Sequence, residues 1–447
     1  MERRILFTIM LTSFLTPFTG SAVNLALPSL GAKFAASPAS LGWVLGSFLL
    51  AAIVVLLPFG KLADRYGKRR FFIMGNGIFA LTSLAACFAP NLPLLIAARA
   101  AQGIGSAMTF ATSMSILTLV IPKERRGWAM GWNVAVVYTG LTLGPAIGGF
   151  LNYYYGWQSI FAVLTLLGSL AFFTARHFLQ EEWYEEASSP WDKKGALLYG
   201  LAILLITLSL SELSAQSLAP CLLLTGILFL GLFIRCELHT ENPLLPLSLL
   251  QGNKAFSLPC LAALLNYCAT FATSFLLSLY LQSILGMTSR SAGLILLSQP
   301  IIMAALSPLM GTLSDKYAPA KLSALGMTLI TIGLSGFALS VHQLSFYLLI
   351  PMLLITGAGF ALFAAPNNNA IMSAVEKKHY SLAASLLSTV RLVGQVLSVA
   401  MMNLLLAQDW SGLSSQESLL QNLTLALLFF ALISALGIVP AKIRHIH

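Results

Sequence analysis

A cluster of opposite charges interrupts an otherwise apolar stretch of the sequence. The charged residues are Asp64, Arg65, Lys68, Arg69 and Arg70; Gly60 precedes them and Gly67 lies among them. A carboxylate can bind the unpaired N–H groups at a neighbouring helix terminus in one conformation and release them in another. The glycines allow close helix approach and a tight turn. The pattern predicts a conformational gate, and the alternative is an ordinary basic loop at a membrane surface.

Two arginines, Arg99 and Arg391, stand inside apolar segments. A charged group at membrane depth costs at least ~2.5–3.5 kcal/mol on insertion scales and usually faces a cavity or a partner. Polar residues recur near both arginines at helical spacing: Gln102, Ser106, Thr109 and Ser113 in one segment, and Ser388, Gln395 and Ser398 in the other. Such stripes predict a hydrated path with a substrate site. The alternative for Arg99 is a bond to backbone carbonyls of a neighbouring helix.

Other polar and aromatic residues within apolar segments are further candidates for substrate binding. They are Asn24, Tyr138, Asn266, Tyr267, Gln282 and Asn367. The run Asn367-Asn368-Asn369 follows Pro366 and is expected at a broken helix that faces the cavity. For any single tyrosine or asparagine, an ordinary hydrogen bond between helices is the alternative.

The sequence lacks the residue patterns of an enzyme. It contains no His, Cys, Asp or Glu cluster at metal-ligand spacing, no nucleophile–base pair and no P-loop. Neither a metal nor another cofactor is expected, and a membrane-embedded transferase remains only a remote alternative. The five cysteines form no CxxC pair and are expected to pack within helices.

The composition places these residues in a membrane. Of 447 residues, 57% are hydrophobic and 9% are charged, whereas soluble domains are about 25% charged. We predict an all-α polytopic membrane protein with fourteen spans of about 20 residues each. The predicted spans cover residues 5–27, 41–60, 71–89, 93–119, 128–151, 157–177, 195–213, 219–236, 255–283, 291–313, 321–340, 345–372, 381–406 and 421–441.

The charge distribution orients these spans. Nearly all of the 25 Lys and Arg fall in cytoplasmic segments when both termini are placed in the cytoplasm. The net charge of +10 is therefore a positive-inside signal in the cell membrane, and no nucleic-acid partner is expected. The expected partners are membrane lipid and a small-molecule substrate, and the protein is expected to be a monomer.

A degraded repeat divides the chain into two halves. The pattern Gly60-x-x-x-Asp64-Arg65-Tyr returns as Gly311-x-x-x-Asp315-Lys316-Tyr. Transporters with related halves bind substrate where the halves meet. The predicted organisation is a six-helix bundle (1–177), a cytoplasmic linker (178–194), an inserted helix pair (195–236), a second linker (237–254) and a second six-helix bundle (255–447).

These motifs resemble those of a known family. The stretch from Gly60 to Arg70 resembles the signature loop of the major facilitator superfamily, and Arg99-Ala-Ala-Gln102-Gly103-Ile-Gly105 is similar to its fourth-helix motif. The segment with Gly140, Gly144, Pro145, Gly148 and Gly149 resembles the fifth-helix motif of its exporting antiporters. Ser21-Ala-Val-Asn24-Leu-Ala-Leu-Pro28 is similar to the fourteen-helix drug:proton antiporter branch. The resemblance implies a secondary exporter that works by alternating access, with proton antiport.

The glycines of the fifth-helix motif also carry a physical prediction. Gly140, Gly144 and Gly148 recur every four residues and form one groove for close approach of another helix. Pro145 removes a helix hydrogen bond and permits a bend. Generic packing of small residues is the alternative.

One departure from the branch concerns proton coupling. Its members usually carry an acidic residue five positions before the Asn, where this sequence has Thr19. No carboxylate or histidine is expected in mid-membrane, so Asp64 and Glu212 are the remaining candidates for proton coupling. A cavity with two arginines predicts neutral or anionic amphiphilic substrates. A metabolite or lipid facilitator without proton coupling remains the alternative function.

Overall fold

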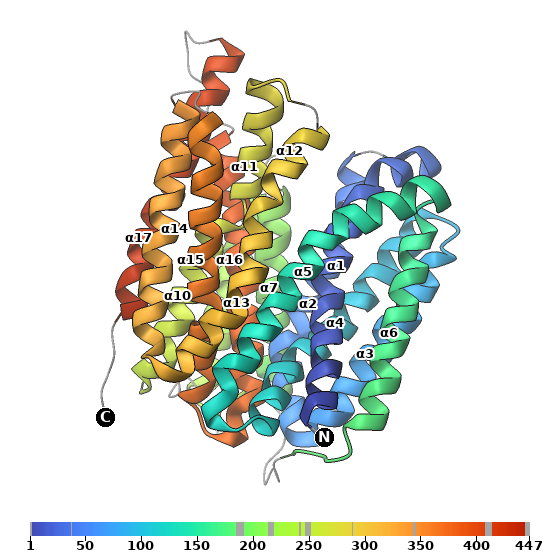
Figure 1. Cartoon of the computed structure of the whole chain (residues 1–447). Coiled ribbons are helices and arrows are strands. Elements are labelled where there is room, and N and C mark those ends of the chain that lie inside the picture. Colours follow the sequence, from blue (N-terminus) through green and yellow to red (C-terminus); the bar gives the residue numbers. More distant parts are fainter. Residues whose placement is uncertain are drawn as a thin grey trace. The chain divides into compact units, whose positions relative to one another are not determined.

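The computed structural model describes residues 2–36, 38–184, 192–212, 219–240, 243–245, 252–287, 289–342, 346–406 and 414–442. All regular elements within these ranges are helices (Figure 1). The predicted all-α class is therefore confirmed.

The first eight helices follow the predicted order. They are α1 (Glu2–Phe34), α2 (Pro38–Tyr66), α3 (Lys68–Cys87), α4 (Leu92–Val120), α5 (Arg126–Tyr155), α6 (Gln158–Phe178), α7 (Lys193–Glu212) and α8 (Ala219–Glu237). A short 3-10 turn, Lys123–Arg125, precedes α5. Several helices extend past the predicted spans because polar residues at membrane surfaces can continue a helix that apolar residues begin.

The remaining helices are more often interrupted. They are α10 (Lys254–Thr270), α11 (Thr273–Leu279), α12 (Ser289–Leu296), α13 (Ser298–Lys316), α14 (Pro319–His342), α15 (Phe346–Ser373), α16 (Tyr380–Leu406) and α17 (Ser415–Lys442). A π-helical turn, Tyr280–Ile284, continues α11, and a 3-10 turn, Lys377–His379, precedes α16.

Thirteen helices among the described residues are long and apolar enough to cross a membrane. Each corresponds to one of the predicted spans. The segment predicted at 195–213 is helical as α7 but is not among the thirteen. The count of fourteen therefore stays a prediction.

The chain forms two compact units, each described by itself. The first comprises residues 1–123, 136–252 and 375–389, and the second comprises residues 124–135, 253–374 and 390–447. The helices α5 and α16 each contribute residues to both units, and the division expected from the sequence stays a prediction.

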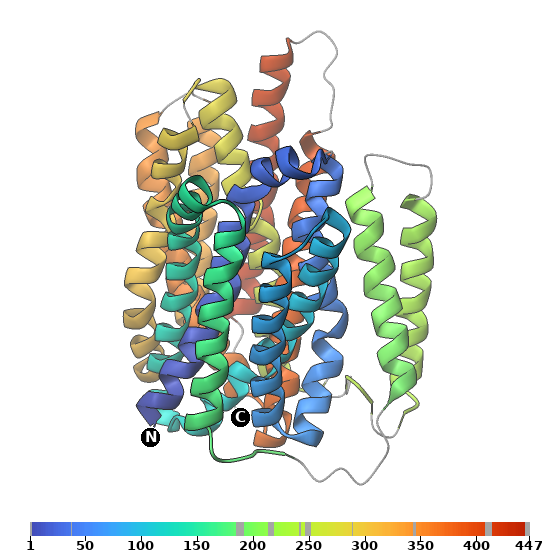
Figure 2. The same ribbon diagram turned by 90° about the vertical axis from the view of Figure 1, so that its right-hand side faces the viewer.

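The core of the first unit is built from α1, α2, α3, α4 and α6. Phe18, Phe48 and Phe161 are almost completely buried in one apolar cluster with residues of these helices. The helices α7 and α8 lie side by side and α7 packs against α2 (Figure 2). The hydroxyl of Tyr199 fixes this contact by donating to the carbonyl of Ile53, 3.0 Å away.

The second unit packs α14 against α15 and α17, and α13 against α15. The helix α15 is continuous from Phe346 to Ser373 although it contains Pro351 and Pro366. The prediction of a broken helix at the asparagine run is therefore wrong. The buried side chain of Asn367 joins α15 to α10, because its Nδ2 donates to the Pro259 carbonyl at 3.1 Å.

Candidate functional site

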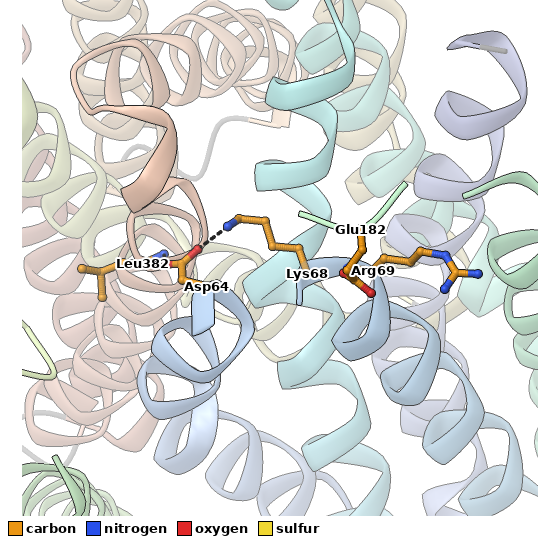
Figure 3. Close-up of polar contacts among 5 residues, drawn as sticks. All are labelled: Asp64, Lys68, Arg69, Glu182 and Leu382. Atoms are coloured by element: carbon orange, nitrogen blue, oxygen red, sulfur yellow. Dashed lines mark hydrogen bonds and ion pairs between the residues drawn. The ribbon is translucent and has the colours of Figure 1, made fainter. Parts of the chain in front are cut away.

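Asp64 binds the beginning of α16. Its carboxylate is buried near the end of α2, and Oδ2 accepts a 3.1 Å hydrogen bond from the Leu382 N–H. Leu382 is in the first turn of α16, where backbone N–H groups have no partner within the helix. The other oxygen forms a 2.7 Å ion pair with buried Lys68 (Figure 3). The charge cluster thus joins α2, α3 and α16 within the first unit.

The tight turn between α2 and α3 depends on Gly67. Its φ of 116° is a left-handed conformation that favours glycine, and a Cβ there would lie 2.6 Å from Glu182 Cδ. This turn reverses the chain so that Lys68 faces Asp64, while the backbone of Arg69 lies beside the Glu182 carboxylate and its guanidinium points away from it (Figure 3). Gly60 is buried within α2, one turn before Asp64.

The segment after α6 is docked on the start of α3. Glu182 Oε1 accepts from the Arg69 N–H at 2.9 Å, and the Trp183 carbonyl accepts from the Lys68 N–H at 2.9 Å. Arg69 Nε also donates to the Leu179 carbonyl. Leu179, Glu182 and Trp183 thus bind the start of α3, because two of them accept from N–H groups that α3 leaves unpaired and the third accepts from the Arg69 side chain.

The outer basic residues of the cluster are less constrained. Arg70 is largely exposed, with Nε 3.6 Å from Glu182 Oε2, so this ion pair contributes little. The guanidinium of Arg65 lies over the ring of Tyr66, 5.4 Å from its centroid. Such loose contacts are typical of basic side chains at the boundary between a membrane and water.

The second copy of the motif makes the equivalent contact in the second unit. Asp315 Oδ1 accepts from the Gly127 N–H at 2.7 Å, and Oδ2 accepts from the Trp128 N–H at 2.9 Å. These two N–H groups belong to the first turn of α5. Each Asp of the repeat therefore caps the beginning of a helix that is distant in sequence.

Arg99 lies on α4 of the first unit and is almost completely buried against α2. It is 1% exposed, Nε donates to the Val44 carbonyl at 2.9 Å, and the guanidinium lies 4.5 Å from the centroid of the Phe48 ring. Its Nη1 donates to Gln102 Oε1, and Gln102 Nε2 donates to Ser83 Oγ at 2.6 Å. The contact with Val44 favours the alternative in which Arg99 bonds a backbone carbonyl of a neighbouring helix.

Arg391 is only half-buried in the second unit and contacts Tyr267 on α10. The Tyr267 ring packs edge-on against Phe360, with ring centroids 5.9 Å apart. Arg391 therefore joins α16 to α10 while part of it stays accessible. This pair is the part of the predicted substrate site that best combines a charge, an aromatic ring and exposure.

The other predicted substrate residues are dispersed. Asn24 is exposed on α1, whereas Tyr138 is buried on α5. Asn266 is fully buried and its Nδ2 contacts Met327 Sδ at 3.5 Å. Gln282 lies in the π-helical turn, a local geometry that is frequent at functional sites, and donates to Ser278 Oγ at 2.7 Å.

The glycine groove of α5 receives α1. A Cβ at Gly148 would lie 2.7 Å from Ala22 Cα, a Cβ at Gly140 would lie 2.8 Å from the Phe14 carbonyl oxygen, and a Cβ at Gly144 would overlap Ser21. The α5 helix continues through Pro145, and both Pro145 and Gly149 are half-buried. The predicted close helix approach is present.

Of the two candidate protonation residues, the structure describes the side chain of Asp64 alone. Asp64 is buried and bonded as above. Glu212 is the last residue of α7, and its side chain lies outside the described part. Thr19, at the position where the branch carries an acid, is buried and donates to the Leu15 carbonyl at 2.6 Å.

Several functional partners could not be found by inspecting residue types. The groups that bind Asp64 and Asp315 are backbone N–H groups, which every non-proline residue has. Glu182 was visible only as one acid in a polar segment. Its role depends on the return of the chain from α6 to the start of α3, which local spacing does not reveal.

Comparisons with known proteins agree with this architecture. The family model described as Major Facilitator Superfamily matches residues 9–257 and 259–444. The riboflavin transporter RibZ of Clostridioides difficile is 31% identical over 91% of this chain and 88% of its own length. The multidrug resistance protein Stp of Mycobacterium tuberculosis is 29% identical over 91% of this chain and 77% of its own length.

Solved structures show the same fold at low sequence identity. The human organic anion transporter MFSD10 matches with a TM-score of 0.69 and 14% identity, covering 98% of this chain and 99% of that one. The proton:xylose symporter XylE matches with a TM-score of 0.68 and 14% identity, covering 98% and 94%. The chain is a multi-pass membrane transporter and belongs to the major facilitator superfamily.

Proposed function

We propose that this transporter exports small, drug-like organic molecules by alternating access. The observation that carries the proposal is the packing of α1 into the groove of Gly140, Gly144 and Gly148 on α5. This groove belongs to the motif that resembles those of exporting antiporters. Relatives named as multidrug resistance proteins and as a methylenomycin A resistance protein support export.

The two aspartates of the repeat act as conformational gates in this proposal. Asp64 stabilises one arrangement of α16, and Asp315 stabilises one arrangement of α5. A carboxylate at a helix N-terminus contributes ~0.3–1 kcal/mol when exposed and up to ~2 kcal/mol when partly buried. An interaction of this size stabilises a conformation while leaving it reversible. Both gates lie on the cytoplasmic side of the cell membrane in this proposal, and both termini lie on that side.

The proposed substrates are neutral or anionic amphiphiles. Arg391 supplies positive charge beside the aromatic rings of Tyr267 and Phe360, which suits an acidic or uncharged ring system. Gln282 in its π-helical turn and exposed Asn24 are further proposed substrate contacts. A permanent lipophilic cation would be repelled by Arg391.

Proton antiport is proposed from the resemblance, with Asp64 and Glu212 as the candidate residues for proton coupling. A second candidate function is facilitated transport of a metabolite or lipid without proton coupling. The buried hydroxyl of Thr19 favours this alternative, because it occupies the position where the branch carries a titratable acid. The name of the riboflavin transporter RibZ also fits metabolite transport.

Purified protein in liposomes that contain a pH-sensitive dye would separate these functions. We expect addition of an exported compound to move protons in the opposite direction, with uncharged and acidic compounds active and quaternary ammonium dyes inactive. Compound movement without a change in internal pH would favour the facilitator. Strong proton-driven transport of a permanent cation would overturn the substrate proposal.

A further inference from the structure

A pair of carboxylates joins the two ends of the α7–α8 hairpin. Asp192 immediately precedes α7, and its Oδ1 accepts from the Gly195 N–H at 2.8 Å, as an N-cap does. Glu237 is the last residue of α8, and its Oε2 accepts from the Leu245 N–H at 2.9 Å. Each carboxylate therefore uses one oxygen to bind backbone and has one oxygen left.

The two remaining oxygens face each other inside the protein. Asp192 Oδ2 and Glu237 Oε1 are both buried and receive no hydrogen bond. Glu237 is only 4% exposed. Gly195 supplies the space between them, because a Cβ at this position would overlap both oxygens. Two ionised carboxylates are acceptors only, so this contact would leave both oxygens unsatisfied and place like charges together.

The neighbouring cations do not neutralise the pair. Lys193 and Lys194 on α7, and Arg235 and His239 near the end of α8, are exposed. Among the described residues, no Lys, Arg or His forms an ion pair with Asp192 or Glu237, and this includes Lys61 and Arg65 of α2, the helix that packs against α7. A Ca²⁺ or Mg²⁺ ion takes about six or more oxygen ligands, and the described residues contain no group of three or more acidic, His or Cys side chains that could hold one.

We propose that Asp192 and Glu237 share one proton, which makes this junction a protonation site of the transporter. One carboxyl O–H donates to the other carboxylate, so a single proton taken from water satisfies both oxygens and no covalent bond to carbon changes. The shared proton then belongs to the junction rather than to either residue alone. Loss of the proton places two negative charges in contact, which loosens the α7 cap or the turn of Leu244 and Leu245. The proposal is independent of what the protein transports.

Infrared difference spectroscopy of the purified full chain during a pH titration tests the site. We expect a protonated carboxyl band that persists near neutral pH, well above the pKa of ~4.3 of an isolated Glu. The band should disappear in both Asp192→Asn and Glu237→Gln, because each amide leaves only one carboxyl at the junction. Glu181→Gln is the control, since Glu181 is exposed, and it should keep the band. A wild-type band unaffected by both substitutions would overturn the proposal.

A second measurement needs no variant. In the wild-type protein, the segments around residues 193–196 and 243–245 should exchange hydrogen faster once the pair ionises, after correction for intrinsic rates. The rate should rise about tenfold for each ~1.4 kcal/mol of stabilisation that ionisation removes. The acceleration should coincide with loss of the infrared band. Constant protection through that titration would overturn the proposal. Loss of the band on adding Ca²⁺ or Mg²⁺ at constant pH would also overturn it, because the site would then be a metal site.

Discussion

Replacement of Asp64 by Asn tests the gate most directly. The amide has the size of the carboxylate and can still accept from the Leu382 N–H, but it has no charge. A hydrogen bond to a charged group contributes ~1.5–3 kcal/mol, against ~0.5–1.5 kcal/mol for a neutral one. The attraction between a charge and a partly buried helix terminus reaches ~2 kcal/mol. Because these contributions overlap, we expect a loss of about 1–2 kcal/mol, or roughly 5–30-fold in the equilibrium that holds α16.

Amide hydrogen exchange reports this change at the bonded group itself. In Asp64→Asn, the peptide that contains Leu382 should exchange roughly 5–30 times faster, while the peptide that contains Gly127 and Trp128 should not change. Asp315→Asn is the matched control and should give the reverse pattern, because Asp315 binds those two N–H groups. Equal exchange in wild type and Asp64→Asn at Leu382 would refute the assignment of Asp64 as the group that holds α16.

Lys68 provides a check on the size of the effect. Its side chain is only 4% exposed and its ion-pair partner is Asp64, so Asp64→Asn leaves a buried cation with less compensation. We expect Asp64→Asn with Lys68→Gln to be less destabilised than the sum of the single variants in thermal unfolding. Strict additivity would show that the ion pair contributes nothing to stability.

Two further predictions concern the helix groove and the arginines. Gly144→Ala should lower stability by ~1–3 kcal/mol in thermal unfolding because its Cβ overlaps Ser21. Gly231→Ala is the control and should be neutral or slightly stabilising, because the space around Gly231 is open. Equal effects of the two substitutions would contradict close packing of α1 on α5. Arg99→Lys should lower the unfolding temperature, since Lys cannot reproduce the planar contact with Phe48. Arg391→Lys should instead raise the KM for acidic substrates. A raised KM in Arg99→Lys together with a lowered unfolding temperature only in Arg391→Lys would contradict the structural role of Arg99.

The sequence predicted the helices well because lipid imposes a simple requirement on length and polarity. All thirteen candidate spans correspond to apolar runs visible in the residues. The glycine periodicity of α5 likewise predicted close approach, and only the identity of the partner, α1, needed coordinates. Interruptions were harder to predict. Pro366 lies within a continuous α15, although a proline removes one helix hydrogen bond and could have marked a break.

The contacts of the charged residues were less predictable, because they depend on backbone groups. Asp64 was visible as a gate candidate, but its partner Leu382 has no polar side chain. Glu182 lies in a segment that composition describes only as polar, yet it caps α3. Asp192 and Glu237 are far apart in sequence, and the α7–α8 hairpin brings them together. The periodicity of residues within one helix contains no information about contacts between segments that are distant in sequence.

The arginines show how burial changes a functional interpretation. In the sequence, Arg99 and Arg391 have the same setting: a cation in an apolar segment with polar residues at helical spacing. In the structure, the Arg99 guanidinium is occupied by a carbonyl, an amide and an aromatic ring, whereas Arg391 keeps partial exposure beside Tyr267. A substrate anion would have to displace the partners of Arg99, each bond to a charged group contributing ~1.5–3 kcal/mol. The expected preference for acidic compounds therefore depends chiefly on Arg391, and neutralising Arg391 should reduce it more than neutralising Arg99.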